Sequence, residues 1–176
     1  MSREESMAAD KYIVGFAYGS NMLLARLRER VPSSEKICMG ILKKHVLKWH
    51  KLSKDGSGKC DAEFTGKDTD EVWGILFKLK ALEKIFLDKA EGLNNGYAEK
   101  KVEILSDHGN MKAKLYYATK KDPAARPYHW YKEIVVAGAR ENNLPNAYTE
   151  TLESVDSIPD PDKKRAAENT KSLSGG

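Results

Sequence analysis

The sequence predicts one mixed α+β domain whose strands curl into a barrel-like sheet. Strand-like segments are interrupted by helix-like segments at irregular intervals, without internal repeats. The 176 residues are the length of one ordinary domain, and 40% of them are hydrophobic, which is enough for a core. We expect a flexible N-terminus over residues 1–10, the folded domain over 11–156 and a disordered tail over 157–176.

The tail has only two large apolar side chains, Ile158 and Leu173, to offset the entropy lost on ordering. Its acidic and basic residues nearly cancel, so it is also a poor electrostatic anchor. The competing interpretation is a short helix over residues 162–168 that docks on the barrel or on a dimer partner.

The first strand is predicted over residues 11–18, which are rich in β-branched and aromatic side chains. A helical pattern follows over residues 22–30, with Pro32 just beyond its end. Ser20 and Asn21 are good N-cap types, so residues 18–21 are predicted to form a strand-to-helix turn.

The segment 35–54 is ambiguous. Leu42, Val46, Trp49 and Leu52 recur at helical spacing. However, the segment runs into the turn cluster 55–58, and the strand-like residues 60–65 come next, which suggests a hairpin. The pattern alone leaves both structures open.

The remaining elements have clearer signals. Strands are predicted over 71–79, 97–105 and 111–119, and a helix over 128–141 with a short helical turn opened by Pro145. Residues 81–90 are predicted to form a short helix with Leu82, Ile85 and Phe86 on one face, and Gly92 suits its C-cap.

Charge and motif content exclude several classes of protein. The net charge is only +4, and the lysine cluster of the 36–59 region is expected to be a solvated face rather than a nucleic-acid site; it holds Lys43, Lys44, Lys48, Lys51 and Lys54. Residues 1–11 lack the apolar stretch of a secretory signal and no apolar run could cross a bilayer, so we expect a cytoplasmic location without membrane contact.

Metal, cofactor and thiol chemistry are also not expected. His45 and His50 have no carboxylate or cysteine at standard metal-site spacing, and no Walker loop, GxSxG elbow or GxGxxG motif is present. Cys38 and Cys60 have no CxxC spacing and are expected to be reduced, buried side chains. We therefore expect neither a metal nor a cofactor.

Two features could carry chemistry. The turn at residues 18–21 can bind an anion, because the first amides of a helix have no partners and Gly19 permits close approach to the backbone. Glu91 ends a predicted helix, and the negative end of the helix dipole raises the pKa of a carboxyl, as general acid-base catalysis requires. Taken alone, each feature also has an ordinary structural interpretation.

Four segments in a fixed order resemble the γ-glutamyl cyclotransferases, especially the mammalian type. They are Phe-Ala-Tyr-Gly-Ser-Asn at 16–21, Glu-Val-Trp-Gly at 71–74, Glu-Gly at 91–92 followed by Gly-Tyr at 96–97, and Gly-Ala-Arg-Glu-Asn-Asn-Leu-Pro at 138–145. The resemblance covers roughly residues 12–155. It implies a small mixed-strand β-barrel flanked by helices, and therefore strands over 35–54. The lysine-rich hairpin and Asn143 depart from the family pattern.

The resemblance also implies site residues. Glu91 would be the catalytic acid/base, and substrate contacts would come from Tyr97, Tyr131 and a cradling loop; the loop residues are Gly15, Phe16, Ala17, Tyr18, Gly19, Ser20 and Asn21. The partner would be a small γ-glutamyl molecule, and a homodimer is possible. The alternatives are a non-catalytic binding module on the same fold and, with less support, a nucleic-acid binder that uses the lysine-rich hairpin.

Overall fold

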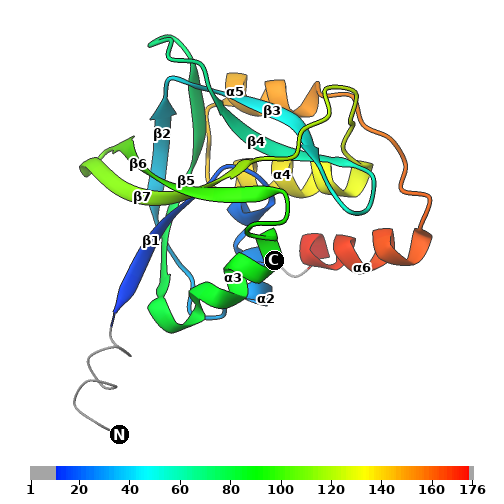
Figure 1. Cartoon of the computed structure of the whole chain (residues 1–176), viewed down its shortest axis with the longest axis horizontal. Coiled ribbons are helices and arrows are strands. Elements are labelled where there is room, and N and C mark those ends of the chain that lie inside the picture. Colours follow the sequence, from blue (N-terminus) through cyan, green and yellow to red (C-terminus); the bar gives the residue numbers. More distant parts are fainter. Residues whose placement is uncertain (1–10, 175–176) are drawn as a thin grey trace, which may run out of the picture.

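Five strands close into a barrel in the computed structural model, which describes residues 11–174 (Figure 1). Their spatial order is β1 (Tyr12–Ala17), β5 (Glu71–Lys80), β2 (Glu35–Lys43), β6 (Tyr97–Ser106) and β7 (Gly109–Ala118). The neighbouring pairs within that order are antiparallel, and a parallel bridge between Gly15 of β1 and Lys114 of β7 closes the ring. This confirms the predicted mixed α+β fold with a barrel.

A two-stranded sheet stands beside the barrel. It consists of β3 (His45–Leu52) and β4 (Gly58–Phe64), which pair antiparallel around the 53–57 turn. The helical spacing of apolar residues in this segment is therefore misleading, and the hairpin implied by the resemblance is confirmed. Pairing with β4 and β5 satisfies the backbone and overrides the local periodicity.

Helical segments cover the ends and one side of the barrel (Figure 1). Two short 3₁₀ turns, η1 (Ser20–Met22) and η2 (Ala81–Glu83), precede α2 (Leu24–Arg30) and α3 (Lys84–Glu91). The C-terminal third of the chain forms α4 (His129–Glu141), α5 (Asn146–Glu153) and α6 (Lys163–Ser174), and both α5 and α6 pack on α4. None of the helices in residues 11–174 has the length and apolar character needed to span a membrane.

The expectation of a disordered tail is wrong for residues 163–174, which form α6, and the expected flexibility of residues 1–10 lies outside the described residues. The reason is polar docking, which a count of large apolar residues does not detect. Asn169 Oδ1 accepts a hydrogen bond from Arg26 Nη1 at 2.9 Å, and Ser172 Oγ donates to Glu29 at 3.2 Å. Leu173 adds an apolar contact with the core.

The start of α2 differs from the predicted N-cap. Neither Ser20 nor Asn21 caps the helix, which begins one turn later at Leu24. Glu141 of α4 caps it instead, because its Oε2 accepts a hydrogen bond from the Leu24 amide at 3.0 Å. Gly138 permits this close packing, since a Cβ there would lie 2.7 Å from the Leu23 nitrogen. The 138–145 motif thus positions the loop that precedes α2.

Leu82 of η2 and Ile85 and Phe86 of α3 are exposed, while Leu87 of α3 is buried. The barrel core is built from β-strand residues such as Val72, Ile75, Leu76, Ile104 and Leu115, all fully buried. This core fixes the strand ends from which the pocket described next is built.

Candidate active site

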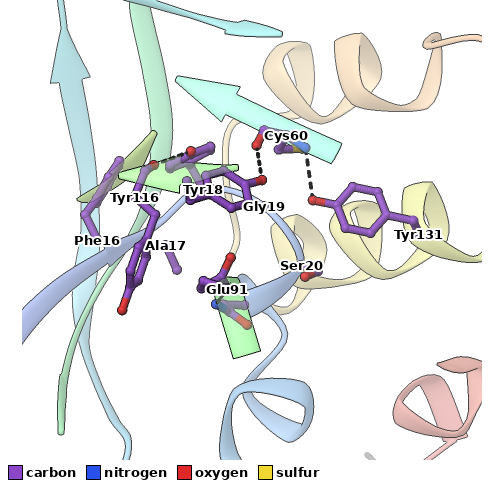
Figure 2. Close-up of a pocket in the computed structure, with 11 residues that line it drawn as sticks. Phe16, Ala17, Tyr18, Gly19, Ser20, Cys60, Glu91, Tyr116 and Tyr131 are labelled. Carbon is purple, nitrogen blue, oxygen red and sulfur yellow. Dashed lines mark hydrogen bonds between the residues drawn. The ribbon is translucent and has the colours of Figure 1, made fainter. Parts of the chain in front are cut away.

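A pocket lies where the end of β1 turns into η1 (Figure 2). It encloses about 350 Å³ of empty space, including its open mouth. The loop contributes Phe16, Ala17, Tyr18, Gly19, Ser20 and Asn21. The other walls are Cys60, Glu91, Tyr97, Tyr116 and Tyr131. Every residue that the resemblance predicts for the site therefore lines one pocket, except Gly15.

Glu91 is the last residue of α3, and Gly92 follows it in the left-handed conformation with φ of 71°, as the predicted C-cap requires. Its carboxylate is held through one oxygen. Oε1 accepts a hydrogen bond from Asn21 Nδ2 at 2.5 Å and forms an ion pair with Arg30 Nη1 at 3.2 Å. Among the described residues, no hydrogen bond reaches Oε2, so this oxygen is available to a bound molecule.

The loop opposite Glu91 presents backbone amides. The 3₁₀ turn uses the Met22 amide, which donates to the Gly19 carbonyl at 3.1 Å. Within residues 11–174, the amides of Gly19 and Ser20 have no backbone acceptor. Gly19 has φ of −117° and ψ of −135°, and its lack of a side chain leaves room for its neighbours, because a Cβ would lie 3.2 Å from the Tyr131 hydroxyl and from Cys60 Cβ.

Two buried tyrosines hydrogen-bond to the backbone of Cys60, which belongs to β4, and Figure 2 shows one of them, Tyr131. Tyr97 donates its hydroxyl proton to the Cys60 carbonyl at 2.7 Å, and the Tyr131 oxygen accepts from the Cys60 amide at 3.1 Å. Tyr18 donates in the same way to the Tyr116 carbonyl at 2.5 Å. These bonds join the loop to β7, and they join the hairpin to β6 and α4, around the pocket.

Burial dominates the ionisation of these tyrosines and of Cys60. It raises the pKa of Tyr18, Tyr97 and Tyr131 well above 10, so their hydroxyls stay neutral. It also raises the pKa of the Cys60 thiol to about 12, which keeps the sulfur protonated. Cys60 is therefore a wall of the pocket rather than an activated nucleophile.

Gly15 does not line the pocket. It directly precedes Phe16 in β1, where a Cβ would meet the Phe77 ring at 2.5 Å, so this glycine makes room for a core side chain. Sequence reasoning missed Cys60 and Tyr116 as pocket residues. Their strands were predicted, but no local signal indicates which strand residues face the β1 turn.

The expected solvated lysine face is wrong for Lys51, whose side chain points inward and is only 7% exposed. Its ammonium lies 4.6 Å from the centre of the Tyr97 ring. Lys48 on the same strand is exposed, as predicted. The sequence pattern could not separate the two, because the β3–β4 pairing shifts register between Lys48 and Lys51.

His50 has the carboxylate neighbours that sequence spacing did not reveal. Its Nε2 lies 2.7 Å from Asp61 Oδ2 and 4.0 Å from Glu63 Oε1. The Lys121 ammonium lies 3.7 Å from Asp61 Oδ2 and 3.4 Å from Glu63 Oε1, so a cation of the chain already occupies this acidic pair. The geometry is that of an ion-pair network.

Comparison with known proteins identifies the family to which this fold and pocket belong. The family model described as the AIG2-like family matches residues 71–152, which include Glu91, Tyr97 and Tyr131. The chain is 32% identical over 146 residues to the gamma-glutamylcyclotransferase of Homo sapiens, a match that covers 80% of this chain and 77% of that protein. The Mus musculus protein of the same name is 30% identical with the same coverage.

A solved structure of a gamma-glutamyl cyclotransferase superposes with a TM-score of 0.82 at 28% identity, over 92% of this chain and 99% of that one. The fold and pocket thus define an AIG2-like barrel with an acid, Glu91, in the wall of its pocket. This chain belongs to the γ-glutamylcyclotransferase family.

Proposed function

We propose that this protein is a γ-glutamyl cyclotransferase that converts γ-glutamyl amino acids or amines to 5-oxoproline and the free amino acid or amine. The observation that carries this proposal is the Glu91 carboxylate, anchored through Oε1 with Oε2 available, opposite a loop with available amides. An acid and an oxyanion-type donor set facing one pocket are what an intramolecular aminolysis needs.

In the proposed reaction, the α-amine of the substrate attacks its own γ-carbonyl carbon. A new carbon–nitrogen bond closes the five-membered lactam, and the γ-amide carbon–nitrogen bond breaks. Glu91 takes the proton from the attacking amine and then gives it to the leaving amine. The amides of Gly19 and Ser20 bind a substrate oxygen that gains charge, and the chemistry needs no protein nucleophile, metal or cofactor.

The pocket contributes mainly by holding the glutamyl chain in the folded conformation that brings amine and carbonyl together. Well-oriented intramolecular reactions gain up to about 7–11 kcal/mol from such positioning. The tyrosines around Cys60 support this role, because their buried hydrogen bonds hold the pocket walls still.

The partner in this proposal is a small γ-glutamyl molecule, and the location is the cytoplasm. A homodimer stays an expectation, to be checked by sedimentation of the full chain. Neither nucleic acid nor a membrane surface has a role in the reaction.

The test is incubation of the purified full chain with a panel of γ-glutamyl amino acids and amines, measuring 5-oxoproline and free amine. We expect both products in equal amounts from at least one substrate. A chain that binds these compounds but releases no 5-oxoproline from any of them is the non-catalytic binding module.

A further inference from the structure

A second pocket adjoins the first and shares four of its walls, Ser20, Glu91, Tyr97 and Tyr131. Its other walls are dominated by cations. We call it the cationic chamber and define it by Arg26, Arg30, Lys51 and Lys59, which all line it.

The charges of this chamber do not balance. Arg30 is paired with Glu91 at 3.2 Å, and Lys59 is paired with Asp55 at 3.2 Å. Arg26 and Lys51 have no carboxylate within 4.0 Å among residues 11–174. The chamber therefore holds two positive charges that no acid of the described chain neutralises.

Lys51 is the more informative of the two. Its side chain is 93% removed from solvent, given its 7% exposure, yet no hydrogen bond within the described residues satisfies its ammonium. Gly96 makes room for it, because a Cβ at that position would lie 3.0 Å from Lys51 Cε. The Lys51 ammonium lies over the Tyr97 ring and has no carboxylate within 4.0 Å among residues 11–174, so its position favours an anion that binds from outside the chain.

Arg26 gives an independent observation. It is 9% exposed, and its Nε is a buried donor without any partner, although Nη1 donates to Asn169. Burial lowers the pKa of Arg26 to about 10 and also lowers that of Lys51, and a bound anion would relieve both. Two unpaired cations in one chamber match two negative groups on one ligand.

We propose that the cationic chamber binds the carboxylates of the leaving amino acid, so that the preferred substrates are γ-glutamyl conjugates of acidic amino acids. This inference rests on the proposed function, because Glu91 must face the amide that breaks. Glu91 is a shared wall of both pockets, so a glutamyl group along the 18–21 loop places the leaving nitrogen at Glu91 and its substituents in the chamber.

The test compares kcat/KM for three substrates: γ-glutamyl-ethylamide, γ-glutamyl-alanine and γ-glutamyl-glutamate, whose leaving groups carry no, one and two carboxylates. We expect the rate constant to rise in that order for the wild type. The kcat/KM for γ-glutamyl-glutamate divided by that for γ-glutamyl-ethylamide is a ratio in which any effect common to all substrates cancels. We expect Lys51→Met to lower this ratio by about tenfold or more, as loss of a charged hydrogen bond would.

Two further variants keep the test sharp. Lys48→Met removes the same charge from the exposed face of the same strand and should leave the ratio unchanged. Lys51→Arg keeps the charge and should retain most of the ratio, which a purely structural role for Lys51 would not predict. A wild type without the expected order, or a Lys51→Met variant that slows all three substrates equally, overturns the inference. Equal slowing would instead place the glutamyl carboxylate in the chamber.

Binding without chemistry separates this inference from the proposed function. N-glutaryl-glutamate and N-glutaryl-ethylamide lack the α-amine and cannot cyclise, and calorimetry measures their affinity for the wild type and for Lys51→Met. If the wild type binds N-glutaryl-glutamate more tightly than N-glutaryl-ethylamide and Lys51→Met loses this difference, the chamber binds the leaving-group carboxylates, even if no substrate is turned over. Turnover without any such preference supports the cyclotransferase and contradicts the chamber.

Discussion

Charged side chains of one type behave differently around this pocket because burial, rather than residue type, sets their properties. Lys48 and Lys51 lie three residues apart on β3, but one is solvated and the other is buried beside the Tyr97 ring. Lys59 is also largely buried, over the rings of Trp130 and Tyr131 at 4.3 and 4.4 Å. Such buried charges make the stability of the protein depend on pH, or its ligand affinity depend on the charge of the ligand.

Lys59 gives a pH-dependent prediction. Burial lowers its pKa from 10.5 to about 8, despite the opposing Asp55 charge. Between these two values the unfolded chain holds a proton that the native state has released, so the free energy of unfolding rises with pH. The cost of burying the charge is present below about pH 8 and is lost by about pH 10.5.

Denaturant unfolding of wild type and Lys59→Met at pH 7.5 and 9.5 measures this effect. We expect the wild type to gain about 2 kcal/mol relative to the variant over that interval, since one pKa unit corresponds to about 1.4 kcal/mol. Parallel behaviour of the two proteins would show that Lys59 keeps an ordinary pKa.

Gly19 gives a prediction about space. Its φ of −117° lies outside the left-handed region, and a Cβ would press on Cys60 and on the Tyr131 hydroxyl at 3.2 Å. We expect Gly19→Val to raise KM at least tenfold while the melting temperature falls by only a few degrees. Thermal melts and substrate titration of the variant and the wild type check both expectations. A variant with normal melting and normal KM would show that the turn does not contact substrate.

At the scale of residues, the sequence predicted those roles that depend on local structure. Glu91 at a helix end and Gly92 as its C-cap follow from neighbours in the chain. The inward turn of Lys51, the contribution of Cys60 and the two carboxylates near His50 depend on strand register, which adjacent residues do not reveal. Gly15 was assigned to the site by resemblance, but it packs against Phe77.

The helices and strands were likewise predictable where their signals are local, and not where distant segments decide the structure. Strands with β-branched residues and bounding turns were predictable, whereas the 35–54 segment was decided by pairing with β4 and β5 against its own periodicity. The 20–24 turn depends on α4, because Glu141 rather than Ser20 or Asn21 caps α2. Such contacts between distant segments have no local sequence signal.

The docking of α6 on the rest of the domain can be tested by deletion. It docks through Asn169 and Ser172 onto α2, the helix that also carries Arg26 and Arg30 of the cationic chamber. We expect deletion of residues 163–176 to remove roughly 1–3 kcal/mol of stability, which corresponds to about 3–10 °C in melting temperature. A circular dichroism melt measures this, with deletion of residues 175–176 alone as the control.

The same truncation should also weaken the preference for acidic leaving groups, because Arg26 loses its Asn169 contact. An unchanged melting temperature would contradict the packing of α6 and restore the interpretation of this segment as a passive tail.

For the whole molecule, the closed barrel is the scaffold that brings the parts of the site together. The barrel fixes the end of β1, the β3–β4 hairpin supplies Cys60 and Lys51, and α3 and α4 supply Glu91 and Tyr131 (Figures 1 and 2). Segments more than a hundred residues apart in the chain thus meet at one pocket. The pattern of strands and helices predicted the mixed α+β fold class, and the resemblance over residues 12–155 predicted most of the pocket lining, whereas Cys60 and Tyr116 had no local signal.

Glu91 transfers the protons of the cyclisation in the proposed reaction, and Glu91→Gln tests this role most directly. The amide keeps the size of the side chain and can still bond to Asn21 and Arg30 through its oxygen. A wild-type melting temperature and unchanged affinity for N-glutaryl-glutamate would verify that fold and binding persist. We predict that kcat for 5-oxoproline release falls by about 10²–10⁴-fold, the usual contribution of a general acid-base group. A kcat within about tenfold of the wild type would contradict the role assigned to Glu91.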